Sequence, residues 1–245
     1  MASIHEFQFF IFSPPMPHPT TTQPSGTALS TPADILAMRK SAFWDRAARK
    51  YAADPIADQA GHEATLQRVQ ALLSNEHEVL EIGCGTGSTA LRLAPGTRSL
   101  MATDVSPGMI SIAKEKLAAR PIAQLSFTLA DADGPLAGAY DAVLAFNVLH
   151  LVDDLDCTIA AVTRSLKPGG LFISKTPCLS ELNPLITRLA LPVMRAIGKA
   201  PHVLCFSKDH LQSAITRQGL NLLSVERHGT RGKDFRVFIV ARKAD

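Results

Sequence analysis

The fold of this chain is decided by one stretch, Val79-Leu80-Glu81-Ile82-Gly83-Cys84-Gly85-Thr86-Gly87. Its apolar first half, which carries the acidic Glu81, predicts a buried strand, and its glycines predict a tight turn into a helix. In open parallel sheets, ligands bind outside the carboxyl ends of the strands, so this turn predicts a site for a nucleoside cofactor. A dinucleotide fingerprint reads Gly-x-Gly-x-x-Gly, but here the third glycine, Gly87, comes one residue early and Ser88 occupies the dinucleotide position.

The rest of the chain alternates short β-rich runs with helical stretches, which is typical of a parallel sheet covered by helices on both faces. Strands are expected at residues 78–82, 99–103, 125–129, 140–146, 171–176, 220–226 and 235–241. Helices are expected at residues 41–53, 63–73, 86–93, 107–118, 151–165 and 207–218. The last two strands flank a glycine-containing turn, which predicts an antiparallel pair. The expected fold is therefore α/β, with a Rossmann-like, seven-stranded, mostly parallel sheet and an antiparallel last strand.

Composition excludes several classes of protein. The 245 residues are 46% hydrophobic and 19% charged, as in an ordinary globular domain. A net charge of +3 is too small to predict a nucleic-acid-binding surface. The four cysteines have no metal-site spacing, so we expect free thiols in a reducing, cytoplasmic compartment and no metal. No apolar run approaches the ~18–20 residues that span a bilayer.

The N-terminal segment differs from the rest of the chain. Residues 1–37 contain a short apolar run followed by a stretch rich in Pro, Thr and Ser. They have neither the positive n-region of a secretory signal nor the arginines of a transit peptide. We therefore expect a disordered or non-native extension, with Met38 as a candidate start and residues 38–245 as the domain.

A second unusual segment is the insert at residues 177–206, between the fifth strand and the next helix. It is rich in apolar residues, and its basic residues Arg188, Arg195 and Lys199 are spaced to share one helical face. Pro192 is expected to kink or split that helix. The insert suits a lid over an apolar acceptor, a contact with a membrane surface, or a helix packed on the sheet edge.

Polar residues that follow the second and third strands are candidates for cofactor contacts. Asp104 ends the second strand, where a carboxylate can accept hydrogen bonds from both hydroxyls of a ribose. The alternative is that Asp104 caps the helix that begins near Pro107. Met109 suits a contact with a flat base or a place in the core, and Asp131 suits a ligand contact or a solvated loop.

The stretch at 79–87 resembles motif I of the class I S-adenosylmethionine (SAM) dependent methyltransferases. Residues 140–150 resemble the strand-four motif of that family, and residues 166–170 resemble the turn before its fifth strand. The helix at 43–51 also looks familial. The resemblance covers about Ser41 to Lys243, and it is closest to the small-molecule branch related to ubiquinone/menaquinone-biosynthesis methyltransferases.

The resemblance implies SAM as cofactor and a role for each matching residue. Asp131, with Ala132 beside it, would bind the adenine, and Asn147 and Val148 would line the sulfonium side. Tyr51 would close over the cofactor, or would instead dock its helix together with Trp44. The expected cofactor-binding residues are Tyr51, Glu81, Gly83, Cys84, Gly85, Gly87, Asp104, Val105, Met109, Asp131, Ala132, Asn147 and Val148.

The expected reaction is methyl transfer to oxygen or carbon of a small organic acceptor by in-line displacement, which mainly needs alignment and exclusion of water. His150 follows the fourth strand and is the candidate catalytic base, although a histidine bonded within its loop is the alternative. The sequence does not identify the acceptor, but an apolar, quinone-like molecule and a peripheral membrane contact are consistent with the insert. The alternatives are a SAM-binding protein without catalysis, an NAD-dependent oxidoreductase and, less favoured, a nucleic-acid methyltransferase.

Overall fold

A computed structural model describes residues 32–182, 185, 187, 191–196, 200–230 and 234–245. Residues 1–31, most of the predicted N-terminal extension, lie outside the described residues. Helix α2 spans Pro32–Ala53, so it begins within the segment predicted as an extension. The extension itself stays a prediction.

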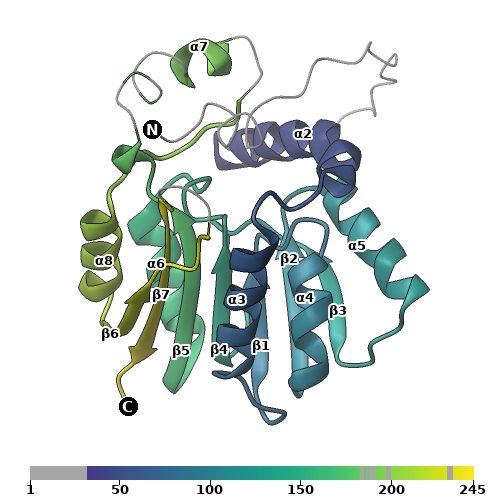
Figure 1. Ribbon diagram of the computed structural model, residues 1–245, viewed down its shortest axis with the longest axis vertical. Coiled ribbons are helices and arrows are strands. Elements are labelled where there is room, and N and C mark those ends of the chain that lie inside the picture. The colour runs from purple at the N-terminus through teal and green to yellow at the C-terminus, as the bar shows by residue number, and fades with distance from the viewer. Residues whose placement is uncertain (1–31, 183–184, 186, 188–190, 197–199, 231–233) are drawn as a thin grey trace.

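The core of the molecule is a seven-stranded sheet with the order β3-β2-β1-β4-β5-β7-β6 (Figure 1). Its strands are β1 Glu78–Ile82, β2 Ser99–Asp104, β3 Leu125–Leu129, β4 Tyr140–Phe146, β5 Leu166–Pro177, β6 Leu220–Glu226 and β7 Arg236–Lys243. Strands β1 to β5 run parallel, and β7 is antiparallel to both of its neighbours. The predicted fold class is confirmed.

Helices cover both faces of this sheet. They are α3 Gln59–Gln70, α4 Ser88–Leu93, α5 Pro107–Ala119, α6 Leu155–Ser165 and α8 Lys208–Arg217. The described residues also form a short helix, α7 Leu191–Ala196, and single 3-10 turns at Ala94–Gly96 and Leu179–Glu181. One buried cluster joins the sheet to α6 and α8, and a second joins it to α3, α4 and α5. Side chains alternate between faces along a strand, so in β1 Val79 belongs to the second cluster and Leu80 to the first.

Two predicted boundaries move for identifiable reasons. Helix α6 begins at Leu155 because Asp154 caps it, its carboxylate accepting a hydrogen bond from the Cys157 amide at 2.9 Å. Strand β5 begins at Leu166, which pairs with Tyr140, and the register then shifts at an irregularity. Neither change alters the order of the elements.

Helix α2 lies across the end of the sheet at which the parallel strands finish, and α7 lies beyond the same end (Figure 1). Asp45 of α2 accepts hydrogen bonds from the Ser106 hydroxyl and, at 2.8 Å, from the Gly108 amide. These contacts tie α2 to the start of α5, so the carboxyl edge of the sheet is covered.

The predicted insert is described only in part. Pro192 is the second described residue of α7, and residues 188–190 before this helix lie outside the described residues, so the predicted kink or split is untested. Arg188 and Lys199 lie outside the described residues, and the predicted basic face is therefore untested.

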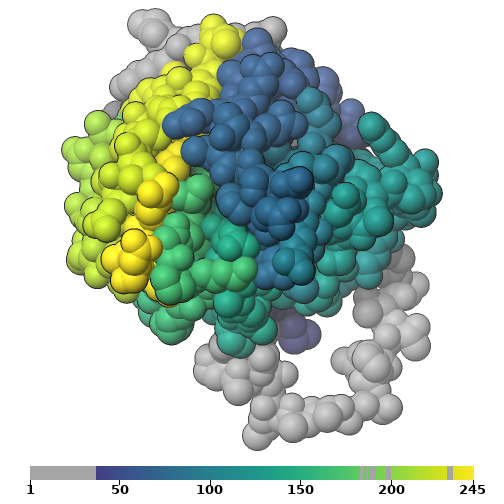
Figure 2. Space-filling view, turned by 90° about the horizontal axis from the view of Figure 1, so that it is seen from below, coloured from purple at the N-terminus to yellow at the C-terminus, as the bar shows by residue number. Residues whose placement is uncertain are grey.

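The opposite end of the molecule is closed by chain segments that are distant in sequence. Seen from below, the yellow C-terminal strand packs between the light-green α8–β6 region and the blue α3–β1 region (Figure 2). An ion pair between Arg68 of α3 and Glu226 of β6, 3.1 Å between the nitrogen and the carboxylate oxygen, joins these regions. The four cysteines are free thiols, as predicted. Within the described ranges, no helix has the length and apolar character needed to cross a membrane.

Candidate active site

A cavity of about 360 Å³ lies at the carboxyl edge of the sheet, between the strand ends and α2. It is lined by the glycine loop after β1, by the segments that follow β2, β3 and β4, and by residues before α3 and β7. All the predicted cofactor-binding residues line it except Gly87. The structure therefore brings residues from five separate parts of the chain into one site.

The glycine loop has a left-handed backbone at each of its glycines, with φ of 66° at Gly83, 55° at Gly85 and 73° at Gly87. A Cβ atom on Gly83 would lie 2.4 Å from Cγ2 of Val148, and one on Gly87 would lie 2.5 Å from Cζ of Phe127. Both glycines are thus required by packing within the protein. Gly85 has the most open surroundings of the three, the nearest atom to its added Cβ being a Tyr51 ring carbon at 3.8 Å.

The Asp104 carboxylate holds the glycine loop in place. One oxygen accepts a hydrogen bond from the Gly85 amide at 2.9 Å, and the other accepts from the Ser106 amide at 2.9 Å. The cap of α5 is Ser106, whose hydroxyl accepts from the Met109 amide at 3.1 Å, so Asp104 does not cap that helix. Burial raises the pKa of Asp104 above its usual value, although the two amide hydrogen bonds oppose this effect.

Two buried polar atoms at the cavity have no hydrogen-bond partner in the described part of the chain. They are Oε2 of Glu81 and Oδ1 of Asn147. Burial, together with the charge of Asp104, raises the pKa of Glu81 to about 8. Asn147 has a φ of 54°, a left-handed conformation that is uncommon outside glycine and enriched in asparagine. Buried acceptors without partners are costly, so these atoms suit a ligand that carries hydrogen-bond donors.

Sequence reasoning did not identify Lys40, which ties α2 to the cavity. Its ammonium forms ion pairs with Asp131 at 2.8 Å, Asp133 at 2.6 Å and Asp153 at 2.9 Å. Burial lowers the pKa of Lys40, but the hydrogen bonds to the three carboxylates outweigh burial and raise it well above its usual value. Asp131 is therefore an ion-paired residue and not a free loop carboxylate, and its contact with adenine stays a prediction.

The aromatic face of α2 contributes to the cavity and to the core. Tyr51 lines the cavity with half of its surface exposed, and its ring meets that of Trp44 edge to face at 6.3 Å. Met109 is buried against Ala48 and Trp44, and it also lines the cavity. Met109 is therefore a core residue that also lines the cavity, and its contact with a base stays a prediction.

His150 is placed differently from its prediction as a catalytic base. It is buried and is not among the residues that line the cavity. Burial lowers the pKa of His150 to about 3, so the ring is neutral and weakly basic. The structure thus argues against His150 as the base, because a general base must reach the proton that it removes.

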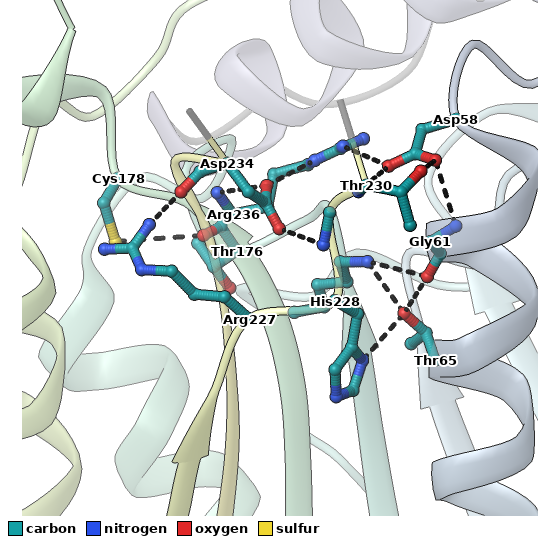
Figure 3. A network of polar contacts seen from close by, with 12 residues as sticks. Asp58, Gly61, Thr65, Thr176, Cys178, Arg227, His228, Thr230, Asp234 and Arg236 are labelled. Atoms are coloured by element: carbon teal, nitrogen blue, oxygen red, sulfur yellow. Dashed lines mark hydrogen bonds and ion pairs between the residues drawn. The ribbon is translucent and has the colours of Figure 1, made fainter. Parts of the chain in front are cut away.

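The half of the cavity away from the glycine loop contains ionisable residues that sequence reasoning did not identify. They are Asp58, His62, Lys175, Asp234 and Arg236. Figure 3 shows Asp58 at the start of α3 facing Thr230 and Arg236 of the β6–β7 segment. These residues come from three regions that are far apart in sequence, so no local sequence motif predicts them.

Fold and cavity together define the class of this protein. A parallel sheet of this strand order, with a glycine loop after β1 and a carboxylate at the end of β2, is a Rossmann-like site for a nucleoside cofactor. Residues 80–172 match the family model described as "Methyltransferase domain". This part of the chain is therefore similar to a methyltransferase domain, and the match covers residues 80–172 and not the whole chain.

Similar proteins include a reducing polyketide synthase, Preu2, of Preussia isomera, which is 34% identical over 121 residues, 45% of this chain and 5% of that protein. A magnesium-protoporphyrin O-methyltransferase of Rhodobacter capsulatus is 29% identical over 131 residues, 49% of this chain and 58% of that protein. The chain thus spans only part of the curated relatives that it matches.

The crystal structure of the magnesium protoporphyrin IX methyltransferase of Synechocystis PCC 6803, which has S-adenosylhomocysteine (SAH) bound, shares the fold. It superposes with a TM-score of 0.62 at 19% identity, over 86% of this chain and 98% of that one. These similarities favour a methyltransferase over the dinucleotide-dependent alternative.

Proposed function

We propose that this protein transfers a methyl group from SAM to an oxygen or carbon atom of a small organic acceptor, with SAH as the second product. The observation that carries the proposal is the cavity in which the glycine loop, Asp104 and the unpartnered Oε2 of Glu81 meet. SAM has a ribose with two vicinal hydroxyls and a methionine end with an ammonium group. Both groups are donors, and this part of the cavity is rich in acceptors.

The residues present suit such a ligand. Asp104 would accept from the ribose hydroxyls, and Glu81 would face the ammonium group. Asp131, Ala132, Val105 and Met109 would surround the adenine, while Asn147 and Val148 would line the sulfonium side. The Cys84 and Gly85 backbone would lie along the methionine and ribose portions.

When bound, SAM supplies a methyl group on a positively charged sulfur, which leaves with the electron pair of the broken carbon–sulfur bond. The protein positions the acceptor in line with that bond and excludes water, for which the cover formed by α2 is suited. The carboxylates of Asp104 and Asp131 place negative charge around the part of the cavity that would hold a cation, and a cation bound there would favour ionisation of Glu81. Tyr51, above the glycine loop, would close the site.

The remaining features of the proposal follow from the sequence. The resemblance to ubiquinone/menaquinone-biosynthesis enzymes suggests an acceptor with an apolar body, and free thiols suggest a cytoplasmic location. A peripheral contact between residues 177–206 and a membrane would suit such an acceptor.

Calorimetric titration with SAH tests the proposal. Wild-type protein should bind SAH, and Asp104→Ala should weaken binding by about 100-fold, since hydrogen bonds to a charged group contribute ~1.5–3 kcal/mol each. Asp104→Asn, which keeps one acceptor oxygen, should lie between them. Asp209→Ala, at a carboxylate that is 85% exposed, is the matched control and should bind as wild type does.

A folded wild-type protein that binds NADH and not SAH would overturn the proposal. Binding of SAH with no methyl transfer from SAM to any of a broad panel of phenols, carboxylic acids and 1,3-dicarbonyl compounds would favour a SAM-binding protein without catalysis.

A further inference from the structure

Lys175, near the carboxyl end of β5, is a buried cation in the half of the cavity away from the glycine loop. It is 6% exposed and lines the cavity. The cavity lining also includes apolar residues, among them Pro55, Ile56, Leu66, Phe146 and Phe235. A lysine in such surroundings is costly unless its ammonium is well paired, so its partners decide what this part of the cavity can bind.

The contacts of the ammonium group are few and uncharged. Nζ donates to Oγ1 of Thr65 at 2.7 Å and, over 3.4 Å, to the backbone carbonyl of Gly61. An ammonium has three donors, and the longer contact lies at the limit of a hydrogen bond. At least one donor therefore has no strong acceptor within the described residues.

The two carboxylates whose charges act on Lys175, Asp58 and Asp234, form hydrogen bonds with other groups (Figure 3). Asp58 accepts from the Gly61 amide at 3.0 Å and from the amide and hydroxyl of Thr230 at 2.9 and 2.6 Å. Asp234 accepts from the Gly229 amide at 2.7 Å and from Nε of Arg236 at 3.1 Å. Neither forms an ion pair with Lys175 within 4 Å, so the structure describes no anionic partner for it.

The electrostatic balance at Lys175 reflects this arrangement. Burial and the positive charge of Arg236 lower the pKa of Lys175 to about 8, although Asp234 and Asp58 oppose the shift. His62, also in the cavity, has its pKa lowered by burial and by Lys175, so it is neutral at pH 7. The ammonium is therefore charged near neutral pH but poorly solvated.

We propose that Lys175 is the docking point for a carboxylate on the methyl acceptor, whose apolar body lies against the wall of this half of the cavity. The inference rests on the proposed function, because it assigns a substrate class to the same site. A carboxylate would supply the strong acceptor that the ammonium lacks, and the charge-assisted hydrogen bond would offset the desolvation of both groups.

The charge of the surroundings favours a singly charged ligand group. Asp58 and Asp234 lie near enough to act on Lys175, and they would repel a second negative charge. A phosphate, which carries up to two charges at neutral pH, is therefore disfavoured. Phosphate serves as a negative comparison in the test.

The test compares two carboxylic acids with the amides of the same shape, and with inorganic phosphate. 3-Phenylpropionate, 3-phenylpropanamide, octanoate, octanamide and inorganic phosphate are titrated calorimetrically into wild-type protein at pH 7, with and without saturating SAH. The carboxylates should bind at least tenfold more tightly than their amides, and phosphate should bind more weakly than the carboxylates. Lys175→Met should abolish the carboxylate preference, and Lys175→Gln serves as a second variant with a polar side chain. Lys208→Met, at a half-exposed lysine outside the cavity lining, is the matched control and should keep the preference.

Equal affinity for acid and amide, binding of no carboxylate, or a preference that survives in both Lys175 variants would each overturn the inference. SAH affinity of the same variants is measured separately, and an unchanged value shows that they fold and keep the cofactor half of the cavity. A carboxylate preference in a wild-type protein that binds no SAH would leave the Lys175 site standing while the methyltransferase proposal fails. SAH binding without a carboxylate preference would overturn the Lys175 inference and leave the methyltransferase proposal standing.

Discussion

The Lys40→Met substitution removes an ammonium that three carboxylates share. Lys40 lies on α2, and its partners Asp131, Asp133 and Asp153 lie in the segments after β3 and β4. Methionine keeps the length of the side chain and loses its charge. The variant therefore leaves three neighbouring carboxylates without their common counterion and weakens the attachment of α2 to the rest of the domain.

The magnitude follows from how buried these groups are. Removing one partner of a fully buried ion pair costs ~3–5 kcal/mol. Here the carboxylate side chains remain 17–28% exposed, and Asp133 keeps hydrogen bonds from the Thr158 hydroxyl and the Asp153 amide. We therefore expect a loss of about 2–3 kcal/mol in the free energy of unfolding at pH 7.5.

The loss should depend on pH in a defined direction. Burial raises the pKa of Asp133, but hydrogen bonds from Lys40, Asp153 and Thr158 outweigh it and hold the pKa below its usual value. A carboxyl group with a lowered pKa in the folded state stabilises above its unfolded pKa of about 3.9, and this stability is lost as the pH falls further. The difference between wild type and Lys40→Met should therefore shrink below about pH 4.

Urea unfolding monitored by circular dichroism measures both effects. Lys167→Met is the matched control, because Lys167 also bridges two carboxylates, Glu78 and Asp141, at 2.9 Å each but is 34% exposed. An exposed pair contributes up to ~1 kcal/mol, so this variant should lose less than Lys40→Met. The reasoning is refuted if the two variants lose the same stability at pH 7.5, or if the loss in Lys40→Met does not diminish in acid.

Two further predictions concern the glycine loop and the buried histidine. Gly83→Ala should lower the free energy of unfolding by about 2–4 kcal/mol, because Gly83 has a positive φ and an added Cβ would overpack against Val148. Gly96→Ala, which has open space around it, should lower it by under about 1 kcal/mol in the same urea titration. Equal losses would show that the contact is relieved by small movements. His150→Gln should leave kcat for methyl transfer within about threefold of wild type. In the wild-type protein the buried neutral ring should lower the free energy of unfolding as the pH falls from about 6.5 toward 3, and the variant should lack this loss. A fall in kcat of about 100-fold or more would restore His150 as the catalytic base.

Much of the cofactor half of the cavity could be predicted from the sequence. In a parallel sheet the carboxyl ends of all strands meet at one edge, so residues that follow successive strands gather there whatever the details of packing. Asp104 was found in this way, whereas Glu81, Asp131 and Asn147 were carried over from the resemblance to methyltransferases, and all four line the cavity. Gly87 was assigned to cofactor binding, but it packs against Phe127 and Ala113, because a glycine motif does not reveal whether a ligand or the protein needs the space.

Burial is harder to predict from a motif than position along a strand. The sequence placed His150 after β4, which is correct, but the direction of its side chain depends on the turn that follows. The ring is buried, and its lowered pKa removes the property that made it a candidate base. A loop position therefore predicts proximity to a site better than it predicts access to it.

The sequence by itself determined the α/β class, the succession of strands and helices along the chain and the location of the cofactor cavity, because each depends on local hydrophobic periodicity and turn chemistry. Only the tertiary structure decided which charged residues face that cavity. Lys40 meets Asp131 across 91 positions of the chain, and Lys175 meets Thr65 across 110. Such contacts depend on how α2 and α3 dock on the sheet, and no local pattern encodes that docking, since it results from the packing of surfaces assembled from the whole chain.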